Sequence, residues 1–169
     1  MRHRWSTLLR ALAAVFVLGC AAAAPASAQA AGPRPGQQLY DPNADARAQI
    51  NAALAQSRTD HRLVLLDFGA DWCLDCWILE RLYQTPQVAG YLDEHFRIVR
   101  IDVGQFDRNL PVVNKYGKPI EGGVPAVVVL APTGQVVATT RDGSLEAARR
   151  LLPDDLRRML EQWVARAPH

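Results

Sequence analysis

Blocks of apolar and polar positions along the chain predict a mixed α/β domain. Between residues 43 and 58 the apolar positions recur at helical spacing, which predicts a short amphipathic helix. Residues 63–68 are apolar at almost every position and predict a buried central strand. A second helical pattern begins near Cys73 and is interrupted at Thr85-Pro86, because proline removes a backbone donor. A further helical segment is expected over residues 86–94.

The second half of the chain predicts three more strands and a last helix. One strand is expected over residues 96–103, followed by a loop and short helix over 104–123. Strands over 124–130 and 135–139, joined by a turn, predict an antiparallel hairpin. The last helix begins at Pro153, and its apolar face consists of Leu156, Met159, Leu160, Trp163 and Val164. This order predicts an α/β fold with a mixed central sheet flanked by helices.

The first 28 residues have the order of a secretory signal peptide. Three arginines precede or begin an apolar, alanine-rich run, which ends in the small residues Ala26-Ser27-Ala28. Cleavage there would change the formal net charge from +2 to −1, so the basic character belongs to the leader. No remaining basic patch indicates nucleic-acid binding. We therefore expect export to the periplasm of a Gram-negative bacterium.

An alternative leader is indicated by Val17-Leu18-Gly19-Cys20, which resembles the lipobox of bacterial lipoproteins. In that case residues 1–19 would be the signal, and a lipidated Cys20 would anchor the protein to a membrane facing the periplasm. Without lipidation, no membrane contact is expected. Both alternatives leave Cys20 outside the folded domain.

Residues 29–42 contain proline and glycine with little apolar periodicity, and they predict a flexible linker. The folded domain is then expected over residues 43–166. The 169-residue chain is 49% hydrophobic and 21% charged, which is typical of a globular protein with a sizeable core.

The candidate functional residues are concentrated in Asp67-Phe68-Gly69-Ala70-Asp71-Trp72-Cys73-Leu74-Asp75-Cys76, where a predicted buried strand is followed by a predicted helix. Two of the three cysteines of the chain lie here, and the third is in the leader. Such a pair can be a zinc half-site, a structural disulfide or a redox dithiol. A zinc site requires further ligands, the domain offers no second cysteine pair, and a disulfide across so short a loop stabilises little. A redox role is therefore favoured, and no metal site is predicted.

This stretch, together with Lys115-Tyr116-Gly117 and Gly123-Val124-Pro125, resembles the thioredoxin superfamily over roughly residues 43–165. The phrase Ala-Asp-Trp-Cys-x-x-Cys is most similar to exported members such as the C-terminal domain of the bacterial transmembrane thiol:disulfide electron carrier. The resemblance implies a three-layer thioredoxin-like fold with the dithiol at a helix N-terminus. It also implies a thiol–disulfide oxidoreductase that needs no cofactor, because the electrons reside in the dithiol.

The resemblance and thiol chemistry together assign roles. Cys73 is expected to be the nucleophile, because a helix N-terminus lowers the pKa of a thiol, and Cys76 the resolving thiol. Asp67 corresponds to the family's buried carboxylate, a candidate general base for Cys76. Val124 and Pro125 correspond to the cis-proline edge that docks a substrate peptide, and Trp72 is expected at the rim.

Two features tune or qualify this site. Leu74 and Asp75 lie between the thiols, and an exposed Asp75 carboxylate would oppose a thiolate and favour a reductant. The family usually places a lysine near the buried carboxylate, whereas the matching position here is Ile98. The arginines around Arg149 are interpreted as solvated surface.

The sequence therefore predicts a periplasmic disulfide reductase. Its expected partners are disulfide-containing exported proteins and a membrane electron donor of the transmembrane thiol:disulfide carrier type. Two alternatives stay open. One is a disulfide oxidase or isomerase of the same fold, and the other is a non-catalytic binding or chaperone module.

Overall fold

The computed structural model describes residues 37–168. The predicted signal peptide and the alternative lipidation site at Cys20 lie outside these residues. The elements in chain order are α1 (Ala46–Asp60), β1 (Leu63–Gly69), α2 (Leu74–Tyr83), α3 (Pro86–His95), β2 (Phe96–Asp102), α4 (Leu110–Lys115), η1 (Pro119–Gly122), β3 (Ala126–Leu130), β4 (Val136–Thr139), η2 (Ala148–Arg150) and α5 (Pro153–Ala165). The predicted helices and strands are all present, with ends that differ by a few residues.

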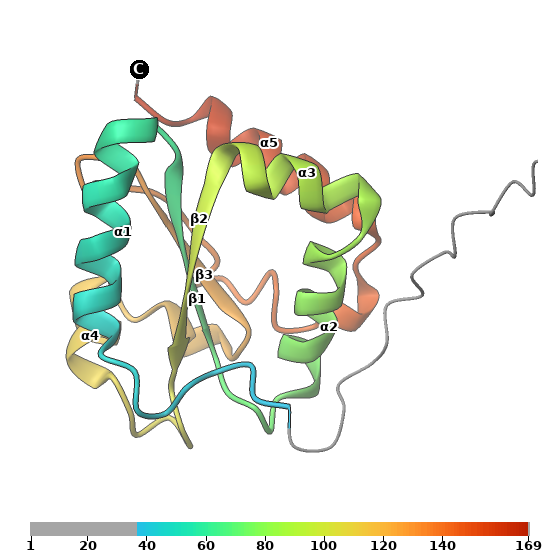
Figure 1. Cartoon of the computed structure of the whole chain (residues 1–169). Coiled ribbons are helices and arrows are strands. Elements are labelled where there is room, and N and C mark those ends of the chain that lie inside the picture. The colour runs from blue at the N-terminus through green and yellow to red at the C-terminus, as the bar shows by residue number, and fades with distance from the viewer. Residues whose placement is uncertain (1–36, 169) are drawn as a thin grey trace, which may run out of the picture.

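The strands form one mixed sheet with the order β2-β1-β3-β4. Strand β1 pairs in parallel with β2 and antiparallel with β3, and β3 and β4 form the predicted antiparallel hairpin. Every residue of β1 is buried, as its continuous apolar sequence predicts for a central strand. In Figure 1, α1 and α4 cover one face of this sheet, and α2, α3 and α5 cover the other. The predicted mixed sheet flanked by helices is confirmed.

Alternation along β1 divides the core between the two faces of the sheet. Val64, Leu66 and Phe68 pack in the cluster that includes α1 and α4. Leu63 and Leu65 pack in the cluster that includes α2, α3 and α5. Both clusters contain fully buried side chains, so the central strand is held from both sides.

The N-terminal boundary differs from the prediction. Residues 37–42, which we call the strap, were expected to belong to a flexible linker, but Tyr40 is only 1% exposed. The backbone N–H groups of Leu39 and Tyr40 each donate to Asp71 Oδ1 at 2.9 Å. These contacts, one buried aromatic ring and two long-range hydrogen bonds, produce no periodic pattern in the sequence, which is why the segment was predicted to be a linker. The folded domain therefore begins before residue 43.

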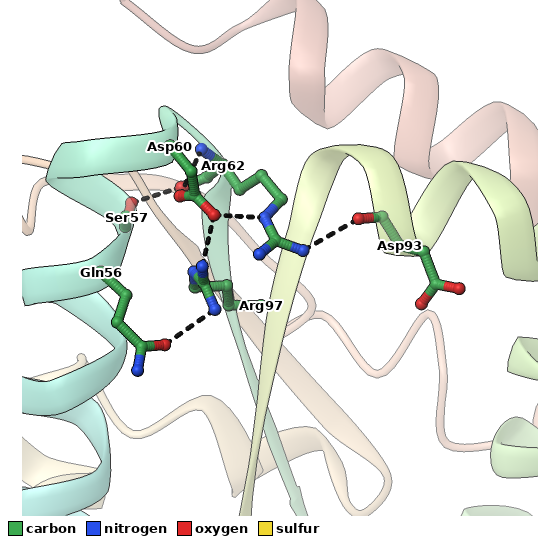
Figure 2. Close-up of polar contacts among 6 residues, drawn as sticks. All are labelled: Gln56, Ser57, Asp60, Arg62, Asp93 and Arg97. Carbon is green, nitrogen blue, oxygen red and sulfur yellow. Dashed lines mark hydrogen bonds and ion pairs between the residues drawn. The ribbon is translucent and has the colours of Figure 1, made fainter.

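A polar cluster ties the C-terminal end of α1 to the neighbouring elements at the opposite end of β1 from the cysteines (Figure 2). Asp60 accepts hydrogen bonds from Arg62 and Arg97, and Arg97 also donates to Gln56 at 2.7 Å. Arg62 donates to the backbone carbonyl of Asp93 at 3.0 Å. Although desolvation raises the pKa of Asp60, the hydrogen bonds from Arg97 and Arg62 lower it to about 2. This cluster organises the end of the sheet remote from the dithiol.

None of the helices within residues 37–168 has the length and apolar character required to cross a membrane.

Candidate active site

The two cysteines lie where β1 passes into α2. Cys73 is the N-cap residue of α2, and its sulfur accepts the backbone N–H of Cys76 at 3.1 Å. The two sulfurs form a disulfide, with the Cα atoms 5.3 Å apart. Both side chains are buried, Cys76 more deeply than Cys73. In the reduced state, the same backbone amide and the positive end of the helix dipole would stabilise a Cys73 thiolate.

Val124 and Pro125 lie beside the first sulfur. The peptide bond between them is cis, and the backbone carbonyl oxygen of Val124 is 3.5 Å from Cys73 Sγ. Pro125 directly precedes β3, which pairs with β1 in the centre of the sheet. The sheet therefore brings together the dithiol and this edge, which are 51 residues apart in the sequence.

Asp67 is buried on β1, the strand that leads to the dithiol. The hydroxyl of Tyr40 donates to Asp67 Oδ1 at 3.0 Å. Burial raises the pKa of Asp67 to about 7, against the lowering effects of the Arg100 charge and the Tyr40 hydrogen bond. A carboxyl group with this pKa exchanges a proton near neutral pH, as a general base must.

The cation near Asp67 comes from a different position than the sequence comparison indicated. Ile98 stands opposite Leu65 in the register of β1 and β2, whereas Arg100 stands opposite Asp67. Arg100 also pairs with Glu80 of α2. The lysine position of the family is thus apolar here, and an arginine two residues further along β2 supplies the positive charge.

Trp72 lies at the surface next to Cys73, with half of its side chain exposed. Its indole N–H donates to the backbone carbonyl of Gly104 at 2.7 Å, and its ring is 5.8 Å from that of Phe106. Leu74 is also exposed. Exposed apolar side chains therefore lie on both sides of Cys73 in the sequence.

Asp75 is only 7% exposed, so the exposed carboxylate predicted from the sequence is not found. Its Oδ1 accepts the backbone N–H of Arg149 at 3.0 Å, and its other oxygen forms an ion pair with the Arg149 guanidinium. The expected repulsion of a thiolate is therefore offset by a cation. Arg149, interpreted from sequence as solvated surface, is part of this contact.

Tyr40, Arg100, Glu80 and Arg149 were missed as site residues. Tyr40 and Arg149 contact carboxylates that are 27 and 74 residues away in the sequence, and neither lies in a motif. Arg100 would have been found by placing β1 and β2 in register. No group of three or more metal-ligating side chains occurs within residues 37–168.

The sheet, the flanking helices and a Cys-x-x-Cys pair at a helix N-terminus define a dithiol protein of the thioredoxin class. Residues 45–132 match the family model described as thioredoxin-like, which is just over half of the chain, and the protein belongs to that family. The predicted thioredoxin-like fold is confirmed. Its Cys73–Cys76 pair is the kind of dithiol on which thiol–disulfide exchange depends.

Two relatives are curated thiol:disulfide interchange proteins of the DsbD type. One from Pseudomonas aeruginosa is 35% identical over 104 residues, which are 60% of this chain and 17% of that protein. One from Pseudomonas fluorescens is 29% identical over 120 residues, or 69% of this chain and 18% of that protein. This chain thus spans less than a fifth of the length of these relatives.

Two solved structures are similar in fold. A disulfide isomerase from Xylella fastidiosa aligns with a TM-score of 0.73 and 39% identity, covering 76% of this chain and 98% of that one. The oxidised C-terminal domain of DsbD from Neisseria meningitidis aligns with a TM-score of 0.50 and 24% identity, covering 70% of this chain and 96% of that one. The second likeness concerns the fold alone.

Proposed function

We propose that the protein is an exported disulfide reductase that acts on disulfides of periplasmic proteins. The observation that carries the proposal is the Cys73–Cys76 pair at the start of α2, next to the Val124 carbonyl and preceded by a strand that carries a buried Asp67. The similarity to thiol:disulfide interchange proteins supports this class of reaction. Electrons would come from a membrane donor of the transmembrane thiol:disulfide carrier type.

The reaction has two exchange steps. The Cys73 thiolate attacks one sulfur of the substrate disulfide, forming a mixed disulfide and releasing the other substrate sulfur as a thiolate, which takes up a proton. Asp67 accepts the proton of Cys76, whose thiolate attacks Cys73 Sγ and releases the second substrate thiol. Two electrons pass to the substrate, and the protein is left with the Cys73–Cys76 disulfide. The membrane donor then reduces that disulfide.

Binding would use the groups around the dithiol. An extended substrate segment beside Val124 and Pro125 would hydrogen-bond to the Val124 backbone as an added strand. Trp72 and Leu74 would contact apolar substrate side chains. Asp75, paired with Arg149, supports the reductive direction less strongly than a free carboxylate would.

Cys76→Ser tests the two-step reaction. Without the resolving thiol, the mixed disulfide at Cys73 persists, and we expect covalent complexes with exported proteins that disappear on treatment with a reductant. Non-reducing electrophoresis followed by mass spectrometry identifies the trapped partners. Cys73→Ser is the matched control, which should trap far less. Equal trapping by both variants would contradict the assigned order of the thiols.

Isomerase activity is a second candidate, because the Xylella fastidiosa relative carries that name and the Asp75 carboxylate is paired with Arg149. A reduction potential well above about −200 mV would favour an oxidase or isomerase over a reductase. A binding or chaperone module is tested by changing both cysteines to serine. If that variant still complements a deletion strain, catalysis by the dithiol is not the function.

A further inference from the structure

The strap brings one aromatic side chain into the space between the buried carboxylate and the resolving thiol. In Figure 1 the strap, drawn in blue, crosses below the sheet near the start of α2. Asp71, which lies between β1 and Cys73, anchors it through the N–H groups of Leu39 and Tyr40. The same loop therefore positions both the strap and the dithiol.

Gly69 shows how closely these groups approach. A Cβ atom on Gly69 would lie 2.4 Å from both Cζ and the hydroxyl oxygen of Tyr40, and 2.9 Å from Cys76 Sγ. The phenol and the resolving sulfur thus pack over the same backbone position, where only glycine fits. Asp67 lies two residues earlier on β1 and on the same face of the strand. The tyrosine hydroxyl consequently adjoins both groups between which the proton would pass.

The charged and titratable groups around Asp67 come from three other elements. The strap contributes Tyr40, β2 contributes Arg100, and α2 contributes Glu80 and Tyr83. Arg100 is paired with Glu80, so the cation is shared. The hydroxyl of Tyr83 is buried without a hydrogen-bond partner, whereas that of Tyr40 donates to the carboxylate directly. Among these side chains, only Tyr40 donates a hydrogen bond to Asp67.

We propose that Tyr40 is a positioning residue for the resolving step: its hydroxyl hydrogen bond stabilises and orients the ionised Asp67, and its ring excludes water from the space next to Cys76. The inference rests on the proposed role of Asp67 as the base for Cys76. A hydrogen bond donated to the ionised form lowers the pKa of a carboxyl group. The strap thereby becomes part of the active site.

The two exchange steps can be followed separately with an aromatic disulfide that releases a coloured thiolate. Mixing it with the reduced protein releases one thiolate when Cys73 attacks and a second when Cys76 resolves the mixed disulfide. The pH dependence of the second phase reports the proton transfer from Cys76. The first phase is an internal control, because Tyr40 is not expected to affect attack by Cys73.

Tyr40→Phe removes the hydroxyl and keeps the buried ring. We expect the pH midpoint of the second phase to rise by about 1, since a hydrogen bond to a charged group is lost. Tyr83→Phe is the matched control, because it removes a buried hydroxyl near Asp67 that makes no hydrogen bond, and its midpoint should stay at the wild-type value. In an Asp67→Asn background, Tyr40→Phe should produce no further change. Carbon-13 NMR titration of the Asp67 carboxyl provides a second measurement, with the same upward shift expected.

The outcomes separate this inference from the proposed function. If Asp67→Asn leaves the second phase and its midpoint unchanged, Asp67 is not the base and the role of Tyr40 is wrong with it, whereas the disulfide reductase is tested independently by trapping with Cys76→Ser. If Asp67→Asn abolishes the pH midpoint of the second phase but Tyr40→Phe behaves as wild type, Asp67 remains the base and the proposed role of Tyr40 is wrong. An equal shift in Tyr83→Phe would also overturn it, because the effect would then not depend on the hydrogen bond.

Discussion

At the scale of single residues, Asp67 shows how the fold trades stability for chemistry. The carboxyl group is buried on the central strand, and burial raises its pKa to about 7 despite the opposing effects of Arg100 and Tyr40. A free aspartate has a pKa far below neutral pH, so it is a weak base. The environment therefore moves its proton exchange into the range where a thiol can be deprotonated.

Asp67→Asn is expected to stabilise the folded protein at neutral and alkaline pH. The pKa of Asp67 is 3.8 when unfolded and about 7 when folded, so the folded state holds the extra proton between these values. Stability contributed by this group is complete below about pH 4 and is lost as the pH rises through 7, by at most about 4 kcal/mol. Urea unfolding at pH 5 and pH 8 should show this loss in the wild type and much less of it in the variant.

Asp93→Asn is the matched control for this measurement. Its side chain is exposed, so the variant should retain the wild-type dependence of stability on pH. An Asp67→Asn protein that loses as much stability as the wild type between pH 5 and pH 8 would contradict the raised pKa of Asp67.

At the scale of elements, the start of α2 depends on η2, which lies more than 70 residues further along the chain. Asp75 is in the first turn of α2, where a negative charge is favourable to the helix dipole but unfavourable to a neighbouring thiolate. Arg149 of η2 meets this carboxylate with both its backbone N–H and its guanidinium. The negative charge of Asp75 therefore still stabilises the N-terminus of α2, while the Arg149 charge reduces the effect of Asp75 on the thiols.

Arg149→Ala should therefore slow attack by Cys73 without removing it. The uncompensated Asp75 charge would disfavour the thiolate, and we expect the first phase with the aromatic disulfide at pH 7 to slow roughly threefold to tenfold. The ion pair is partly solvated, so the free energy of unfolding should fall by only about 1 kcal/mol. Arg150→Ala, a change at the exposed neighbour, is the control. Equal rates for the two variants would show that Asp75 does not act on Cys73.

The elements around the dithiol show what the sequence could predict. Cys73 was found because a Cys-x-x-Cys pair between a predicted strand and a predicted helix is a local pattern. Asp67 and Pro125 were found through the resemblance to the thioredoxin superfamily, which gives both positions a place relative to a strand. Tyr40 and Arg149 were not found, because their contacts depend on how a strap and a short turn fold back onto α2. Ile98 was matched to the family's lysine by sequence, but the pairing of β1 with β2 determines that Arg100 faces Asp67.

At the scale of the whole molecule, the active site is assembled by both faces of the sheet. The strap leads into α1 on one face, and α2 and η2 lie with the core of the other face. The central strand β1 carries Asp67 between them. A change in the redox state of the dithiol is therefore expected to alter the stability of the entire domain, which should unfold as one unit.

The direction of electron transfer can be tested through that stability. The reduction potential depends on the relative stabilities of the oxidised and reduced folded proteins, and about 30 mV corresponds to 1.4 kcal/mol. A strong oxidant has the more stable reduced form, whereas a reductant does not. We therefore expect a potential below about −200 mV in a glutathione or dithiothreitol redox buffer, and a Tm that is higher for the oxidised protein than for the reduced one. The Cys73→Ser, Cys76→Ser variant should show no such difference between the two conditions. A reduced form that melts at the higher temperature, with a potential well above this value, would instead identify an oxidase or isomerase.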